Sequence, residues 1–216
     1  MLHPNICSHT INLGGAYPST HVYRCLVLGE GTMRAETVMK YSPLGFFITA
    51  AAAYQGARNH MPWLGLLFVL INMLVFLPFS PIRKERLYLT LAVGAAGFVV
   101  DSLLITAGVY RVGEQSRWLL AGFLCPEWIL ALWLNYGFAL YVFKPFLSRT
   151  WWIPVVVGLV FSTLIYTNAG RMELITFPLA KTVSLGIIAV IYALFIPACN
   201  VIANKIIGGP HVVTQT

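Results

Sequence analysis

Charged side chains are scarce in this sequence, and acidic ones are scarcer than basic ones. Only 10% of the 216 residues are Asp, Glu, Lys or Arg, whereas soluble domains carry about 25%. Hydrophobic residues make up 58% of the chain, and the mean hydropathy is +0.78. So little polar surface excludes a water-soluble globular domain and indicates that lipid is the main solvent of the protein.

The sequence also lacks the short motifs of common nucleotide-dependent, metal-dependent and hydrolytic enzymes. It contains no P-loop, no dinucleotide glycine fingerprint, no H-E-x-x-H pair and no G-x-S-x-G nucleophile elbow. Its four cysteines show no C-x-x-C spacing, so neither a disulfide framework nor a metal site is indicated. We expect no cofactor and no metal, and the motifs assign no catalytic residue.

Long hydrophobic runs are what the sequence does contain. They recur from Leu44 to Ala203 and are continuously apolar, unlike the alternating strands of membrane barrels. The pattern predicts an all-α fold, a polytopic membrane helical bundle of about six transmembrane helices. The expected spans are 44–57, 62–79, 87–109, 126–143, 151–167 and 179–203, with an apolar interfacial piece at 118–124.

The regions around the spans divide the chain into three parts. Residues 1–40 contain no apolar run long enough for a signal peptide or a span, so a flexible N-terminal segment is predicted there. A further hypothesis is that translation starts at Met33, because codons for residues 29–31 would resemble a ribosome-binding sequence. The six-span membrane domain is expected at 41–205, and a cytoplasmic tail at 206–216.

The net charge of +7 would suggest nucleic acid for a soluble protein, but here the basic residues lie mostly in short connections between spans. Such residues set membrane topology, and no nucleic-acid partner is expected. With a cytoplasmic N-terminus, that side would hold nine basic residues: Arg24, Arg34, Lys40, Arg83, Lys84, Arg86, Lys144, Arg149 and Lys205. The opposite side would hold five: Arg58, Arg111, Arg117, Arg171 and Lys181. Both termini are therefore predicted to be cytoplasmic.

Asp101 is the most informative polar residue, since it interrupts the third span. A carboxylate at the centre of a bilayer costs roughly 2.5–3.5 kcal/mol on insertion scales, so it needs a partner or must be neutral. Arg58, Arg171 and Lys181 are expected at similar depth in the outer half. Gly97 lies one turn before Asp101 on a face predicted to look inward. A structural pairing and a ligand or proton site both remain open, and the two arginines equally fit snorkelling or loop anchoring.

Other polar and aromatic residues fall in the same predicted half. Glu127 follows a proline at an expected helix start, where the helix dipole favours a negative charge, so helix-end stabilisation competes with a role in a site. Tyr166 completes the predicted polar cluster near the end of the fifth span. Trp128 and Trp133 suit packing or lipid-facing positions, or a substrate cage. A carboxylate with a Tyr and an Arg would serve acid–base chemistry or bind an anionic headgroup.

Two motifs carry a family resemblance. The first reads Gly97-Phe98-Val99-Val100-Asp101-Ser102-Leu103-Leu104 followed by Gly108, and the second reads Pro126-Glu127-Trp128 followed by Leu132-Trp133. Pro62-Trp63-Leu64-Gly65 and Tyr166 with Gly170-Arg171 add to the match. In these residues, over roughly 44–203, the chain resembles domain-of-unknown-function family 2878, a family of small bacterial inner-membrane proteins. The resemblance implies a multi-pass protein of the bacterial inner (plasma) membrane.

The chain departs from the family pattern at two places. Phe161-Ser162-Thr163 stands where the family has Gly-Gly-Pro, and Tyr141-Val142 stands where it has an Asn-His pair, so roles tied to those residues are not implied here. Family members are encoded near enzymes that resemble cyclopropane-fatty-acid synthases. This neighbourhood implies a connection with lipid or envelope modification.

Three functions remain open on the sequence. The first is an accessory component that binds or handles a lipid or amphiphile in the outer half of the membrane, with Asp101, Arg58 and Arg171 making the polar contacts. The second is a small-solute-binding subunit of a transporter, which requires a membrane-protein partner. The third is a membrane enzyme that modifies lipid chains with Asp101 or Glu127 as acid or base, so enzymatic activity is undecided.

Overall fold

The structure, a computed structural model, describes residues 37–120 and 122–207. The prediction of a flexible segment at 1–40, the hypothesis of a start at Met33 and the predicted tail at 206–216 lie largely outside the described residues. Within them the fold is helical, which confirms the all-α prediction.

The helices follow the apolar runs of the sequence. They are α2 (Ser42–Arg58), α3 (Leu64–Phe76) with the 3-10 turn η1 (Leu77–Phe79), α4 (Arg83–Thr106), α5 (Glu127–Leu147), α6 (Trp152–Arg171) and α7 (Lys181–Ile207). By length and composition, α4, α5, α6 and α7 can cross a membrane, and α3 with η1 forms a shorter apolar helix. The structure therefore supplies four candidate spans among the described residues, and α2 and α3 are the shorter helices of the six predicted.

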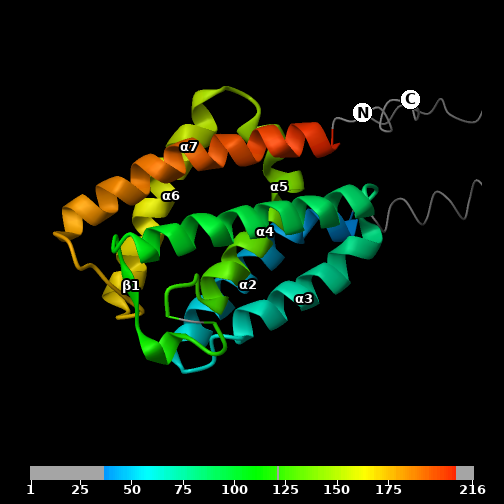
Figure 1. Ribbon diagram of the computed structural model, residues 1–216. Helices are drawn as coiled ribbons and strands as arrows, with labels where there is room; N and C mark the ends of the chain where they lie inside the picture. Colours follow the sequence, from blue (N-terminus) through cyan, green and yellow to red (C-terminus); the bar gives the residue numbers. More distant parts are fainter. Residues whose placement is uncertain (1–36, 121, 208–216) are drawn as a thin grey trace, which may run out of the picture.

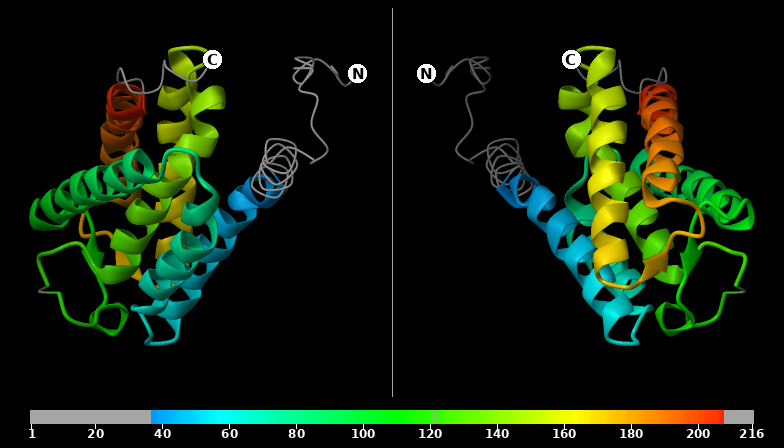
Figure 2. Two further views of the ribbon diagram at one scale, coloured as in Figure 1. Left: turned by 90° about the vertical axis from the view of Figure 1, so that its right-hand side faces the viewer. Right: turned by 90° about the vertical axis from the view of Figure 1, so that its left-hand side faces the viewer.

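Helix α5 occupies the middle of the bundle. It packs against α2 and α3 on one side and against α4 and α7 on the other. In Figure 1, α4 and α7 run side by side across the view, while α2 and α3 form an antiparallel pair below them. Helix α6 packs closely on α7 but makes few contacts with α5, and Figure 2 shows the α5–α6 turn projecting from the bundle. This loose contact leaves space between α6 and the rest of the bundle.

Small side chains allow α2 to approach its neighbours closely. Thr49, Ala53 and Ala57 are all buried on one face of α2. A Cβ atom added to Gly65 of α3 would lie 2.8 Å from the Cβ of Ala53 and 2.9 Å from that of Ala131 in α5. The three helices meet where no larger side chain would fit.

Arg86 departs from the prediction. The sequence places it in a basic connection, but α4 begins at Arg83, and Arg86 lies inside that helix with its side chain fully buried. Its Nε donates to the Phe138 carbonyl oxygen (3.0 Å), its Nη2 donates to the Ser42 hydroxyl (3.0 Å), and its guanidinium lies 3.7 Å from the centre of the Phe138 ring. A planar, delocalised cation tolerates such burial because it can stack on an aromatic ring while its donors find acceptors.

A two-stranded sheet joins the connection after α4 to the connection after α6. Strand β1 (Arg111–Val112) follows α4, strand β2 (Ile175–Thr176) follows α6, and they pair antiparallel with Arg111 opposite Thr176. The apolar piece expected at 118–124 is not helical in its described residues. The sheet therefore holds the loop after α4 against the loop after α6.

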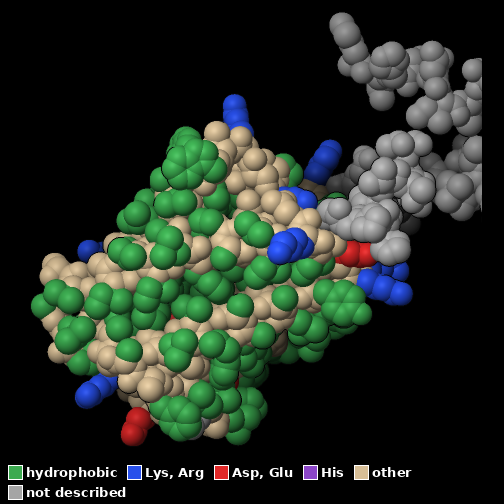
Figure 3. All heavy atoms as spheres, turned by 45° about the horizontal axis from the view of Figure 1, so that its top comes forward, with side chains coloured by type: hydrophobic (Ala, Val, Ile, Leu, Met, Phe, Trp, Pro, Cys, Tyr) green, Lys and Arg blue, Asp and Glu red, His purple; other side chains and the backbone are tan. Residues whose placement is uncertain are grey.

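The surface fits a lipid environment. Figure 3 shows hydrophobic side chains spread over the body of the molecule on one face, with Lys and Arg side chains mostly near its edges. Large apolar side chains along the long helices are more than half exposed, among them Leu103, Leu164, Val190 and Leu194. Contiguous apolar exposure of this kind is typical of a protein that faces lipid.

Candidate functional site

Asp101 of α4 accepts hydrogen bonds from four neutral side chains on four other segments. Its carboxylate is fully buried. The Tyr110 hydroxyl donates to Oδ1 (2.7 Å), the Tyr192 hydroxyl lies 2.9 Å from Oδ2, and the Tyr166 hydroxyl and the Trp133 indole N–H donate to Oδ1 and Oδ2. Four donors match the acceptor capacity of one carboxyl group. We call these five residues the Asp101 cluster.

The donors come from parts of the chain that are distant in sequence. Trp133 lies on α5, Tyr166 on α6 and Tyr192 on α7. The Tyr166 and Tyr192 hydroxyls are 2.6 Å apart, and their rings meet edge to face with centroids 5.7 Å apart. The Asp101 cluster therefore joins α4 to each of the three helices that follow it.

A glycine on α4 makes room for the indole. A Cβ atom at Gly97 would lie 2.2–2.7 Å from three ring atoms of Trp133, which is closer than atoms can approach. Gly97 lies one helical turn before Asp101, so the indole packs on the helix backbone while its N–H reaches the carboxylate. The prediction that this face of α4 looks inward is confirmed, because Gly97 and Asp101 are both buried.

A left-handed turn brings Tyr110 back to the helix that precedes it. Gly108 adopts a φ of +72°, a conformation that glycine adopts at little cost, and the Val109 amide donates to the Leu104 carbonyl (3.0 Å). The β1–β2 pair then holds the chain directly after Tyr110. Burial raises the pKa of the Tyr110 hydroxyl well above its usual value, so this side chain remains protonated and donates to Asp101.

Next to the Asp101 cluster lies an elongated cavity of about 540 Å³ between α2, α5, α6 and α7. Its walls are almost wholly apolar, and most of its large side chains are aromatic. Tyr166, Tyr192 and Trp133 line it, whereas Asp101 and Tyr110 do not. A molecule in the cavity would therefore contact the rings around the carboxylate and not the carboxylate itself.

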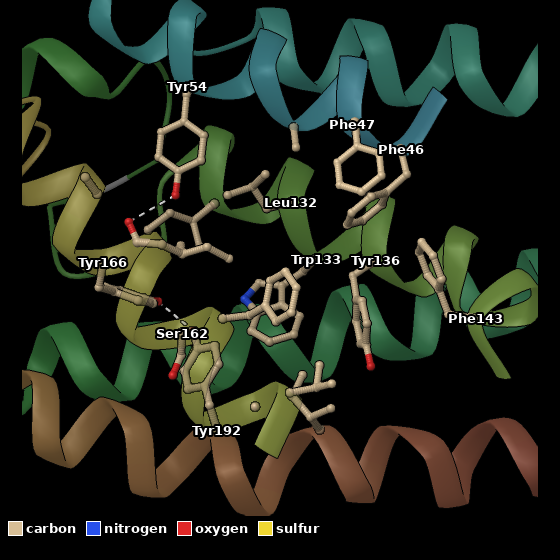
Figure 4. Close-up of a pocket in the computed structure, with 18 of the residues that line it drawn as sticks. Phe46, Phe47, Tyr54, Leu132, Trp133, Tyr136, Phe143, Ser162, Tyr166 and Tyr192 are labelled. Carbon is tan, nitrogen blue, oxygen red and sulfur yellow. Dashed lines mark hydrogen bonds between the residues drawn. The ribbon is translucent and has the colours of Figure 1, made fainter. Parts of the chain in front are cut away.

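The two ends of the cavity differ in exposure. Figure 4 shows Tyr54, Tyr166 and Tyr192 at one end and Phe46, Phe47 and Phe143 at the other, with Trp133 and Tyr136 between them. At the first end Tyr166 is 3% exposed, and the Tyr54 hydroxyl donates to the Ile165 carbonyl (3.2 Å), which joins α2 to α6. Near the second end Phe47 and Phe146 are 59% and 57% exposed. We call them the closed end and the open end.

The structure brings together two of the six predicted site residues, Asp101 and Tyr166. The other predicted partners of Asp101 lie apart from it: Arg58 at the end of α2, Arg171 at the end of α6 and Lys181 at the start of α7 are all exposed. In the described part of the chain, the hydrogen bonds to Asp101 all come from neutral donors. A buried carboxyl group can thus be satisfied by hydroxyl and indole groups without a cation.

Glu127 serves a different part of the molecule. Its Oε1 accepts from the Leu119 and Leu120 amides (2.6 and 2.8 Å), and its Oε2 accepts from the Trp118 amide (3.2 Å). Glu127 is the first residue of α5, directly after Pro126, so its negative charge also lies at the positive end of the helix dipole. The arrangement supports the helix-end interpretation and adds a function, which is to hold the loop before α5.

Sequence reasoning did not select Tyr110 and Tyr192 for the site. Tyr192 lies in the middle of the sixth apolar run, away from the interfaces where tyrosines of membrane proteins gather, and this position was the available signal. Tyr110 offered no such signal, because its place depends on the turn at Gly108. Trp128 and Trp133 are buried and line the cavity, which excludes lipid-facing positions for both.

The comparison with protein families gives one match. A family model described as "Protein of unknown function (DUF2878)" matches residues 43–198, and the chain belongs to this family. The match includes the helices that form the cavity, up to most of α7, and all five residues of the Asp101 cluster. Comparisons with curated proteins and with solved structures found no match.

Proposed function

We propose that this member of the DUF2878 family is a multi-pass membrane protein whose cavity holds the apolar chain of a lipid or other amphiphile. The observation that carries the proposal is the aromatic cavity of about 540 Å³, which opens near the exposed Phe47 and Phe146 on the outside of the bundle. Ligand pockets in proteins measure about 300–1,000 Å³. Water would find few polar partners there, whereas a hydrocarbon chain would contact apolar atoms along its whole length.

The proposal includes a location. We place the protein in a bacterial inner (plasma) membrane with about six spans and both termini in the cytoplasm. Helices α4 to α7 are long enough to cross, whereas α2 and α3 with η1 are short and would need their interfacial side chains to reach the headgroups. Exposed Trp151 and Trp152 at the start of α6 suit the aromatic belt. A C-terminal reporter found on the outer side would contradict this orientation.

The geometry favours binding over catalysis at this site. An enzyme that used Asp101 as acid or base would need its carboxylate within hydrogen-bond reach of the reacting group. Here the carboxylate lies behind Tyr166, Tyr192 and Trp133, and its acceptor positions are filled by their donors. The alternative of a transporter subunit depends on a membrane-protein partner and stays a prediction.

Quenching of tryptophan fluorescence tests the proposal directly. Bromine atoms on a lipid chain quench an indole only on contact, and Trp128 and Trp133 line the cavity while being 1% and 6% exposed. Replacing the remaining tryptophans by Phe leaves these two as reporters; the positions are Trp63, Trp118, Trp151 and Trp152. In bilayers of brominated lipid we expect clear quenching relative to unbrominated lipid.

A matched pair of variants on α2 separates cavity binding from surface contact. Ala50 lines the cavity, whereas Ala51 is exposed outside it. Ala50→Phe should fill part of the cavity and protect the reporters, and Ala51→Phe should leave the quenching unchanged. Reporter fluorescence that is the same in brominated and unbrominated bilayers would refute the proposal.

A further inference from the structure

The open end of the cavity lies beside basic side chains at the turn between α5 and α6. Phe143, Phe146 and Leu147 of α5 line the cavity, and Lys144 lies on the same helical turn, outside the cavity lining. The Arg149 amide donates to the Phe146 carbonyl (3.3 Å), so Arg149 follows the cavity face directly past the helix end. Two cations therefore lie on the stretch of chain next to the open end of the cavity.

The same turn carries the marks of the membrane–water interface. Trp151 is 82% exposed and Trp152 is 50% exposed, and such tryptophans lie at the level of lipid headgroups. The Ser148 hydroxyl donates to Asn200 Oδ1 of α7 (3.3 Å), which fixes the turn against the bundle. A lipid with one chain in the cavity would thus have its headgroup at the height of Arg149.

Charge differs between the two ends of the bundle. Among the described residues, the end with the α5–α6 turn carries one acidic residue, Glu85, and the basic residues Lys40, Arg83, Lys84, Arg86, Lys144, Arg149 and Lys205. The other end carries acidic Glu114, Glu127 and Glu173 with basic Arg58, Arg111, Arg117, Arg171 and Lys181. The end at which the cavity opens is therefore the more positive one, and a negative surface potential of the membrane favours clusters of this kind.

The closed end offers little to a charged headgroup. Tyr54 donates its hydroxyl hydrogen to the Ile165 carbonyl oxygen, and Tyr166 and Tyr192 donate theirs to Asp101. Among the residues that the structure describes, no Lys, Arg or His lines the cavity. A phosphate or carboxylate placed there would be desolvated without a cation, with the Asp101 carboxyl group behind the neighbouring rings.

We infer that the ligand is an anionic lipid whose headgroup lies beside Lys144 and Arg149 and whose chain extends through the open end toward Tyr166. This inference rests on the proposed function and adds the headgroup class and the end of the molecule from which the lipid enters. It differs from the sequence-based expectation of a headgroup near Arg58 and Arg171, because those side chains lie at the end where the cavity is closed.

The experiment compares two lipids with the same brominated chains. The first lipid is brominated phosphatidylglycerol, which is anionic, and the second is brominated phosphatidylcholine, which is zwitterionic. Each is titrated into nanodiscs that contain the variant whose only tryptophans are Trp128 and Trp133. Each cation near a membrane surface contributes an attraction equivalent to about a fivefold change in binding. We therefore expect phosphatidylglycerol to reach half-maximal quenching at a several-fold lower mole fraction than phosphatidylcholine.

Charge-removing variants locate the headgroup. Arg149→Gln and Lys144→Gln should each reduce the preference for phosphatidylglycerol about fivefold or less, with quenching by phosphatidylcholine unchanged as a measure of intact folding. Arg171→Gln, an exposed cation at the closed end, is the matched control and should keep the preference. Equal quenching by both lipids, or a preference lost only in Arg171→Gln, would overturn the inference while leaving chain binding intact. Absence of quenching by either lipid would instead overturn the proposed function.

Discussion

Replacing Asp101 by Asn tests whether one carboxyl group holds α4, α5, α6 and α7 together at this site. The substitution exchanges one acceptor oxygen for an amide NH2, which can only donate. If the remaining oxygen still accepts from the tyrosine hydroxyls that donate to Oδ1, the new NH2 group faces the Trp133 indole N–H. The indole N–H and the NH2 group are then two buried donors without an acceptor. Each unpaired buried group costs about 1–3 kcal/mol, so we expect a loss of about 2–6 kcal/mol in the free energy of unfolding.

Tyr110→Phe is the matched control for this change. It removes one donor of the Asp101 cluster, leaves the acceptor in place and does not alter the cavity wall, because Tyr110 does not line the cavity. The expected loss is about 0.5–1.5 kcal/mol, the net contribution of one hydrogen bond. Both variants keep the shape of the replaced side chain, so the difference between them reports hydrogen bonding and not packing.

Reversible unfolding in mixed micelles, followed by far-ultraviolet circular dichroism during a titration with sodium dodecyl sulfate, measures both losses. The double variant completes a cycle, and its coupling energy isolates the pair formed by Asp101 and Tyr110. An Asp101→Asn protein that is no less stable than Tyr110→Phe would refute the reasoning, since it would show that the buried donors find other acceptors.

Two further substitutions test individual contacts. Gly97→Ala places a methyl group inside the Trp133 ring and should destabilise the bundle by about 1–3 kcal/mol, as overpacking does. Gly186→Ala is the control and should be neutral or stabilising, because nothing lies within 4 Å of the added methyl group. Equal melting temperatures of the two variants would contradict this prediction. Glu127→Ala removes the acceptor of three loop amides. Hydrogen exchange of the amides of residues 118–120 should therefore become faster relative to that of the α5 amides. Unchanged exchange rates would show that the Glu127 carboxylate is dispensable for holding the loop.

The positions of the helices could be predicted because an apolar run long enough for a bilayer leaves the backbone few alternatives to a helix. The start of α4 could not be predicted, because the burial of Arg86 depends on Phe138 and Ser42, which come from two other helices. A single sequence does not specify which helices are neighbours, and a charged residue near the end of an apolar run is therefore assigned to a loop.

The candidate site, too, could be predicted from the sequence only in part. Asp101 could be selected because a carboxyl group within an apolar run is costly wherever it lies. Its partners could not be identified, since depth alone suggested cations, whereas the fold brings Tyr110 through the turn at Gly108 and Tyr192 through the packing of α7. The cavity was not predictable either, because it exists only where α6 leans away from α5 and rests on α7.

The separation in sequence between Asp101 and its donors has a consequence for biosynthesis. Chains are inserted from the N-terminus, so α4 enters the membrane before the ribosome has made Tyr166 and Tyr192, which follow Asp101 by 65 and 91 residues. During that interval the Asp101 carboxyl group must find its hydrogen-bond donors in water, in the translocation machinery, or in Tyr110 and Trp133 alone. The insertion of α7 then completes the set of donors. The insertion of α6 and α7 is therefore the step after which a nascent chain can reach its final fold.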